Sequence, residues 1–249
     1  MAKYLKKFET TAAYQAAESS LILPNVSLTV DNNTVHYNPI SPTPPAPTHD
    51  YVEIAGIKWA TMNIGANSVT DSGLFFQWGD TQGYTAAQVG EGEGQKYFGY
   101  DDYKFYDDGS YTKYNYTDKL YALQSSDDAA TAAWGGNWRI PTNEEFDAIV
   151  SSTTTAWTND YQGSGVAGLV LTDNTDSSKI LFFPAAGGCD NGSVHNVGTS
   201  SCYWTSEPDY YDGAGYAYYF ACDEYGGGWT DTNRVYGYTV RGILDDSNN

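Results

Sequence analysis

"WGGNWRIPTNEEF", residues 134–146, combines a glycine turn, two tryptophans and the start of a helix. The paired glycines predict a tight turn, because glycine adopts left-handed backbone angles at no steric cost. Thr142, with Glu145 three residues later, predicts a capping box that begins a helix just after Pro141. The stretch is therefore typical of a scaffold that starts one helix at a fixed place, and it is not expected to form an active site.

Helical spacing predicts that Phe146, Ile149 and Val150 form the buried stripe of this helix. The structural interpretation of the same stretch also places Trp134, Trp138 and Ile140 in the core. Arg139 is expected to be a buried pairing residue. A second short helix is predicted in "SSDDAATAAWG", residues 125–135, with Ser125 or Ser126 as its N-cap and two aspartates in its first turn, where they suit the helix dipole.

From Tyr51 onward, short β-like runs alternate with glycine and asparagine turns. With the two short helices, they predict an α+β domain over residues 50–245, followed by a disordered tail at 246–249. Residues 90–119 are rich in Tyr, Asp and Gly without regular order. We interpret them as a long surface insertion or a tyrosine-studded loop.

The first 40 residues predict a separate unit made of a helix and a hairpin. An alanine-rich run at 6–20 suits a short helix, and "VSLTV" and "TVHYN" flank Asp31-Asn32-Asn33 as two strands would. Residues 41–49 hold four of the nine prolines and predict a stiff spacer. Residues 1–40 are therefore expected to be an attachment or oligomerisation segment.

Charge and composition exclude several partners. The formal net charge is -19 with only 12 Lys and Arg, so nucleic acid and anionic membranes should be repelled. The sequence contains no run of about 18 apolar residues that would predict a membrane-spanning helix. It also lacks the apolar region that follows the N-terminal basic residues of a signal peptide. The three cysteines fit no zinc motif. The sequence is compatible with one disulfide and one free thiol, and also with three free thiols.

Six ordered motifs over residues 52–243 carry a family resemblance. They are "IKWATMNIGA", "FFQWGD", "DDAATAAWGGNWRIPTNEEF", "ILFFPAAGG", "YWTSE" and "NRVYGYTVRGI". Together they resemble the major paralogous domain first described in Fibrobacter succinogenes, which is abundant in Bacteroidetes and their phages. The resemblance implies a C-type lectin fold of short twisted antiparallel strands, two short helices and long loops. It also implies that Arg234, Gly237, Val240 and Arg241 belong to the structural frame.

"RIPTNEEF" is also similar to "RLPTEAEW" of the formylglycine-generating enzyme family, which shares that fold. Those enzymes use a pair of reactive cysteines near the chain's end, whereas Cys222 lies in "FACDEYGG" and Cys202 in "SSCYWTS". Acidic neighbours raise the pKa of a thiol and make it a poor nucleophile. The sequence also lacks a Ser/His/Asp or Cys/His set, so we expect a non-enzymatic protein and keep such an enzyme as the third alternative.

Two short acidic motifs raise the question of calcium. Glu207–Asp209 and Trp229–Asp231 loosely resemble the Glu-Pro-Asn and Trp-Asn-Asp pairs that hold calcium in many animal C-type lectins, and residues 173–176 form another acidic loop. Oxygen ligands would suit that cation. Because neither pair is complete, we interpret all three as solvated turn acids. No cofactor or metal is expected, and calcium is the alternative.

The predicted binding region spans Tyr203 to Tyr238, which holds nine of the 23 tyrosines and no lysine. Tyr, Trp, Gly and Ser are the residues of paratopes, because rings supply contact area at low entropic cost. The candidate ligand-binding residues are Tyr210, Tyr211, Asp212, Tyr218, Asp223, Tyr225, Trp229, Asp231, Thr232 and Tyr238. Their positions resemble the variable region of proteins diversified by diversity-generating retroelements, where a rigid backbone carries such residues.

The resulting functional hypothesis is a phage-borne adhesin that presents this surface to a protein or glycan on a bacterial cell. The absence of an export signal favours a virion protein made in the host cytoplasm, attached to other virion proteins or to copies of itself through residues 1–40. A virion structural or decoration protein without a specific receptor is the alternative. The sequence names neither the receptor nor the oligomeric state.

Overall fold

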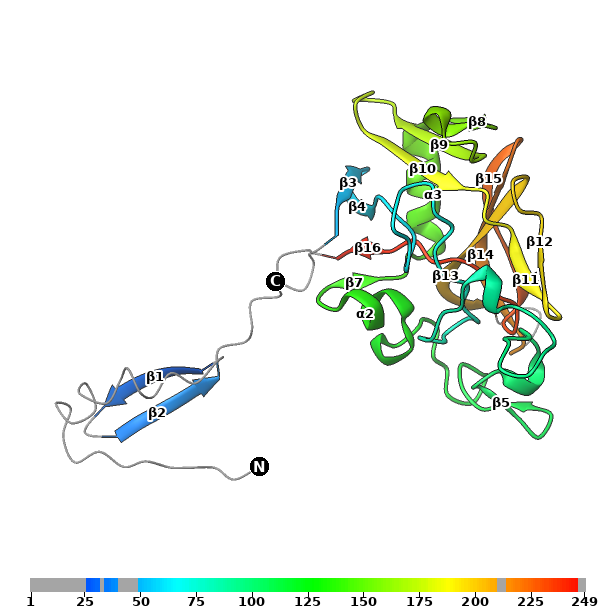
Figure 1. Ribbon diagram of the computed structural model, residues 1–249. Coiled ribbons are helices and arrows are strands. Elements are labelled where there is room, and N and C mark those ends of the chain that lie inside the picture. Colours follow the sequence, from blue (N-terminus) through cyan, green and yellow to red (C-terminus); the bar gives the residue numbers. More distant parts are fainter. Residues whose placement is uncertain (1–25, 32–33, 40–48, 210–213, 246–249) are drawn as a thin grey trace. The chain divides into compact units, whose positions relative to one another are not determined.

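The computed structural model describes residues 26–31, 34–39, 49–209 and 214–245 (Figure 1). The chain divides into two units, Met1–Ala46 and Pro47–Asn249, and the division falls within the proline-rich segment. In the first unit, β1 (Val26–Asp31) pairs antiparallel with β2 (Thr34–Pro39), which confirms the predicted hairpin. The predicted N-terminal helix, most of the spacer and the predicted tail lie outside the described residues.

The helix predicted from the capping box is confirmed as α3 (Asn143–Ser152). The Thr142 hydroxyl accepts the Glu145 backbone N–H at 3.2 Å, and the Glu145 carboxylate accepts the Thr142 N–H at 2.8 Å. Glu145 also binds the Arg139 guanidinium, with Nη2–Oε1 at 2.6 Å. Phe146 and Ile149 of the helix are buried. Because both of its contacts lie within the frame, Glu145 has a structural role.

The predicted N-cap of the other helix is wrong. Ser125–Asp127 form a 3-10 turn, and α2 (Ala129–Trp134) begins after Asp128. The Asp128 carboxylate accepts the backbone N–H groups of Ala130 at 2.8 Å, Thr131 at 2.9 Å and Ile140 at 2.8 Å. A buried carboxylate that satisfies three donors outcompetes a serine hydroxyl that can accept only locally.

Three sheets of antiparallel pairs organise the second unit. The first has the order β3 (Tyr51–Ile54), β4 (Ile57–Ala60), β16 (Ile243–Leu244) and β7 (Trp138–Arg139). The second has the order β10 (Ile180–Pro184), β9 (Gly168–Asp173) and β8 (Thr153–Thr158). The third has the order β13 (Ser200–Asp209), β14 (Tyr216–Asp223) and β15 (Gly226–Asn233).

Smaller elements complete the unit. Two short hairpins pair β5 (Tyr106–Asp107) with β6 (Ser110–Tyr111) and β11 (Gly188–Asp190) with β12 (Ser193–His195). Short 3-10 turns span Ala86–Gln88, Tyr100–Asp102 and Tyr161–Gly163. The described part of the chain is thus mixed α+β with short, mostly antiparallel strands and few helices, as predicted.

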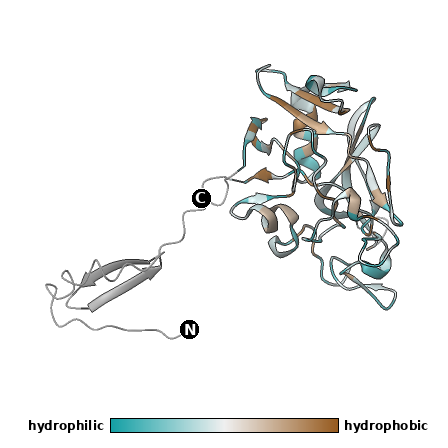
Figure 2. Ribbon diagram, in the orientation of Figure 1, coloured by the Kyte–Doolittle hydropathy of each residue, from teal (hydrophilic) through white to brown (hydrophobic). Residues whose placement is uncertain are grey.

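The core consists mainly of rings. One cluster gathers Trp78, Tyr114, Trp138, Ile140 and Trp204, with Trp134 partly buried against it. A second joins the β9 and β10 strands to α3, where Phe146 stacks on Phe220 with centroids 4.7 Å apart. Figure 2 shows apolar residues along β10 and β16, the strands that line this interior.

Residues 90–119 are mostly exposed and irregular, as interpreted, but four of their rings belong to the core. Phe98, Tyr103 and Tyr114 are almost fully buried, and Phe105 is buried beside them. The Tyr114 hydroxyl donates to Asp127 at 2.7 Å, an acid that Lys104 also contacts at 3.1 Å. Apart from the short β5–β6 hairpin, ring packing and side-chain hydrogen bonds fix the segment in place, so its sequence shows no regular periodicity.

Two buried arginines anchor the C-terminal part of the frame. Arg241 donates to the Asn63 side chain and to the Ala60 and Phe182 carbonyls, each at 2.9 Å. Arg234 donates to the Tyr216 carbonyl at 2.9 Å and lies over the Trp78 ring. These side chains tie the end of the chain to distant strands, so they serve the scaffold.

Candidate ligand-binding surface

The β13–β14–β15 sheet carries most of the predicted binding region. Regular alternation along β14 would bury either Tyr216, Tyr218 and Phe220 or their neighbours. The structure does neither, because Ala217 and Phe220 are both buried and Tyr216 is 37% exposed. A register shift in β13 between Trp204 and Pro208 changes which face points inward along the pair.

One face of this sheet forms a trough with a floor of small side chains. Cys202, Ala221 and Gly228 lie directly opposite one another on the three strands. Opposed residues of antiparallel strands share a face, so these three form a row across the sheet. Two further rows flank this floor. One consists of Trp204, Tyr219 and Thr230, and the other of Ser200, Asp223 and Gly226.

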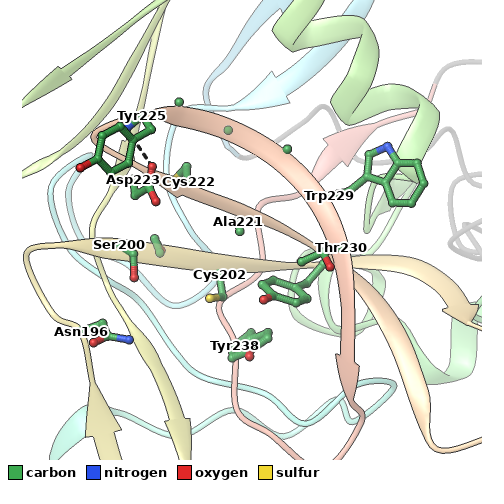
Figure 3. A pocket seen from close by; sticks show the side chains of 15 residues that line it. Asn196, Ser200, Cys202, Ala221, Cys222, Asp223, Tyr225, Trp229, Thr230 and Tyr238 are labelled. Atoms are coloured by element: carbon green, nitrogen blue, oxygen red, sulfur yellow. Dashed lines mark hydrogen bonds between the residues drawn. The ribbon is translucent and has the colours of Figure 1, made fainter. Parts of the chain in front are cut away.

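A cavity of about 610 Å³ occupies this face (Figure 3). Tyr219 and Tyr238, whose ring centroids are 4.8 Å apart, form one wall. Asp223 and Tyr225 lie at the opposite end, where the Asp223 carboxylate accepts the Tyr225 N–H at 2.8 Å. Tyr225 is 89% exposed, so a large ring stands at the mouth of the cavity.

The thiols and phenols of the cavity favour their neutral forms. Burial raises the pKa of Tyr219 to about 12 and that of Cys202 to about 12. Burial also raises the pKa of Tyr238 well above its usual range. Because the thiolate is the reactive form of cysteine, the Cys202 thiol is a weak nucleophile at neutral pH. The cavity therefore offers hydroxyl, thiol and ring contacts, which suit binding.

The opposite face of β14 and β15 carries a second group of candidates. The Trp229 indole N–H donates to the Asp147 carboxylate of α3 at 3.0 Å, and 44% of the side chain is exposed. Its ring meets Tyr218 edge-on with centroids 5.3 Å apart. The Tyr218 hydroxyl donates to Asp209 at 2.9 Å, and Asp231 lies opposite Tyr218 in the strand pair. Figure 3 shows Trp229 turned away from the cavity, toward the helix.

The predicted site is thus distributed over two faces of one sheet. Asp223, Tyr225 and Tyr238 lie at the cavity, and Trp229 is at its rim. Thr232 follows Thr230 by two residues and so shares the cavity face, whereas Tyr218 and Asp231 belong to the α3 side. The predicted residues Tyr210, Tyr211 and Asp212 lie outside the described residues.

Sequence reasoning missed the residues that shape the floor. Cys202, Ala221, Gly228 and Ser200 are small and gave no compositional signal. Tyr219 was not among the predicted binding residues either. The signal that identifies them is strand register, which aligns three separate segments and cannot be read from one segment alone.

Two of the three acidic motifs supply hydrogen bonds within the fold. Glu207 accepts the Asn143 N–H at the start of α3 at 2.8 Å, and Asp173 accepts the Thr175 N–H at 2.7 Å. Within the described residues, no group of three or more His, Cys, Asp or Glu side chains is arranged to hold a metal ion. The three cysteines, all described, are free thiols.

No helix in the described residues is long and apolar enough to cross a membrane. Comparison of the chain with protein-family models, curated proteins and solved structures gives no match.

Proposed function

We propose that this protein is a receptor-binding protein that displays the β13–β15 sheet and its hairpin to a bacterial cell surface. The observation that carries the proposal is the contrast between exposed and anchored rings in one sheet. Tyr225 and Trp229 are exposed to 89% and 44%, whereas Tyr203, Trp204 and Phe220 of the same sheet are almost fully buried. Exposed rings on a rigid support are typical of binding hot spots.

The chemistry of the cavity supports binding rather than catalysis. The Cys202 thiol is held in the neutral form by burial, and burial likewise raises the pKa values of the Tyr219 and Tyr238 hydroxyls. We further propose that the second unit is a C-type lectin-like domain. The motifs resembling that family, the buried Arg234 and Arg241, and the short antiparallel strands support this assignment.

The setting we propose is a phage particle, with Met1–Ala46 as the attachment unit. Two observations support it: the chain divides at the proline-rich segment, and three of its 12 basic residues lie within the first seven positions. A short unit buries little apolar surface by itself and gains stability from a partner.

Cell binding tests the proposal. Fluorescently labelled full chain is incubated with a panel of cultured gut Bacteroidales strains, and retention is measured by flow cytometry. We expect binding to a subset of strains, and Tyr225→Ser should weaken it by about 1–4 kcal/mol, as the loss of a hot-spot ring does. Tyr121→Ser, at a tyrosine that is 65% exposed and outside the sheet, is the matched control.

Binding to no strain, or equal binding by both variants, would overturn the proposal. Melting temperatures of the two variants should match that of the parent chain, since both side chains are exposed.

A further inference from the structure

The outer side of β15 is an open sheet edge. β15 pairs with β14 alone, whereas the outer side of β13 is occupied by Gly187 and Thr239. The Cys202 carbonyl accepts the Thr239 N–H at 3.1 Å, and the Trp204 N–H donates to the Thr239 carbonyl at 3.0 Å. The backbone groups of Cys202 and Trp204 therefore point away from β14.

Alternation along the strands then fixes the direction of every second residue. The backbone N–H and C=O groups of Tyr203 point toward β14 and exchange hydrogen bonds with Phe220. Those of Tyr219 and Ala221 therefore point toward β15. Their partners there, Thr230 and Gly228, point back. The residues of β15 that direct N–H and C=O groups outward are Gly227, Trp229, Asp231 and, at the end of the strand, Asn233. The Asn233 carbonyl accepts the Tyr236 N–H at 3.2 Å, whereas within the described residues the outward groups of Gly227, Trp229 and Asp231 have no hydrogen-bond partner.

β15 lacks most of the devices that usually protect an edge, although it contains the charged Asp231 and is contacted by α3 and β8. Sheet edges are normally blocked by proline, lysine, a bulge or shortness. β15 is eight residues long, pairs with β14 without a register shift, and contains neither proline nor lysine. Gly228, Trp229 and Thr230 are exposed in its centre. Such an edge can accept another extended chain.

Gly228 indicates where a side chain of that added chain would lie. Gly227 is required because an added Cβ would lie 2.2 Å from the Phe220 ring, and Gly226 has a left-handed φ of +124°. An added Cβ at Gly228 meets nothing within 4 Å, so packing does not explain this glycine. Glycine within a strand weakens it and often marks the close approach of a ligand or another backbone. Gly228 is also the end of the trough floor at the open edge.

Charge selects among the partners. Residues 203–233 contain no Lys or Arg, and Asp223, Glu224, Asp231 and Asp147 lie on or beside the edge. A second copy of the chain would bring the same acids against one another. A segment bearing Lys or Arg would be attracted, and its cation could contact the exposed Trp229 ring.

We infer that β15 binds an extended, Lys- or Arg-bearing segment of another protein as an added fourth strand, with one bulky side chain of that segment lying over Gly228. The inference rests on the proposed function, since it names a protein segment as the partner of the same surface. Backbone hydrogen bonds to Gly227, Trp229 and Asp231 supply affinity, and the trough supplies specificity.

The test uses a random dodecapeptide library selected for binding to the full chain. Selected peptides should contain Lys or Arg, and raising the salt concentration should weaken their binding. Amide exchange followed by NMR should show rapid exchange at Gly227, Trp229 and Asp231 in the free protein and slow exchange at all three with peptide bound. The amides of Gly228 and Thr230 should exchange slowly in both states.

A matched pair of variants isolates the edge. Asp231→Ala keeps the outward N–H and Asp231→Pro removes it, and proline is tolerated where the N–H faces solvent on an edge strand. Asp231→Pro should bind the selected peptide about tenfold more weakly than Asp231→Ala. Gly228→Val should keep the melting temperature of the parent chain. It should weaken peptide binding, because the valine side chain would fill the trough.

Three results would overturn the inference: no selected peptide, unchanged exchange at the three outward amides, or equal peptide binding by the two Asp231 variants. A concentration-dependent dimer that protects the same amides would assign the edge to a second copy instead. Because the peptide assay uses no cells, receptor binding through Tyr225 would survive any of these results.

Discussion

At the scale of single residues, burial determines which side chains can react. Cys202 lies at the floor of an open cavity, yet burial raises its pKa to about 12. The thiol therefore remains protonated at pH values where an ordinary cysteine, with a pKa of about 8.5, ionises. Accessibility and reactivity are separate properties here.

Alkylation measures this separation. At about pH 8, Cys202 in the native protein should react with iodoacetamide about 10³-fold more slowly than in the urea-denatured chain, since the rate follows the thiolate fraction. Peptide mapping by mass spectrometry distinguishes it from Cys189 and Cys222, whose thiol pKa values burial also raises. Equal rates in the native and denatured chain would contradict the assigned environment.

At the scale of elements, two helix starts of different strength can be compared. Thr142 caps α3 through one backbone N–H at a partly exposed position. Asp128 caps α2 and also accepts the Ile140 N–H from β7's flank, and all of these donors are buried or partly buried. The second cap therefore connects a helix to a neighbouring segment of the chain.

Substitution should reveal the difference. Thr142→Ala should lower the free energy of unfolding by about 1 kcal/mol, the usual value of an N-cap. Asp128→Ala should lower it by about 3 kcal/mol, because buried N–H groups lose their partner. Urea denaturation of both variants measures the two values, and equal losses would show that the Ile140 contact adds nothing.

The same elements show what a sequence can reveal. The capping box of α3 depends on two residues three positions apart, so "WGGNWRIPTNEEF" predicted it correctly. The cap of α2 is equally local, but Asp128 also accepts the N–H of the distant Ile140, a contact that a single segment does not reveal, and the serine prediction failed. The trough was not predicted for a similar reason. Cys202, Ala221 and Gly228 are brought together only by strand register. The burial of Tyr103, Phe105 and Tyr114 within residues 90–119 was not predicted, because it follows from ring packing without periodicity.

At the scale of the whole molecule, tyrosine burial makes the fold sensitive to alkali. Burial raises the pKa values of Tyr103, Tyr111 and Tyr114 far above the usual range and that of Tyr203 to about 12. A folded-state pKa above the unfolded value of about 10 contributes stability that is complete below pH 10 and is lost as pH rises toward the folded value.

Spectrophotometric titration checks this expectation. The buried tyrosines should ionise only in a late, cooperative step above the usual tyrosine range, and this step should coincide with loss of circular dichroism. The free energy of unfolding should be constant from neutral pH to about pH 9 as far as these tyrosines are concerned. A single titration step near pH 10 with the fold intact would contradict the burial of these rings.

The central claim is that one part of the molecule supports the fold and another binds. Two tryptophans test it with the same substitution: Trp138 is buried in the core beside "RIPTNEEF", and Trp229 is exposed on β15. The direct measurement is cell binding and melting temperature determined on the same samples. Trp138→Ala should cost about 3–5 kcal/mol of stability, whereas Trp229→Ala should keep the melting temperature and weaken binding by about 1–4 kcal/mol. If Trp229→Ala unfolds the protein, or if folded Trp138→Ala has lost binding at full stability, the division between frame and binding surface is wrong.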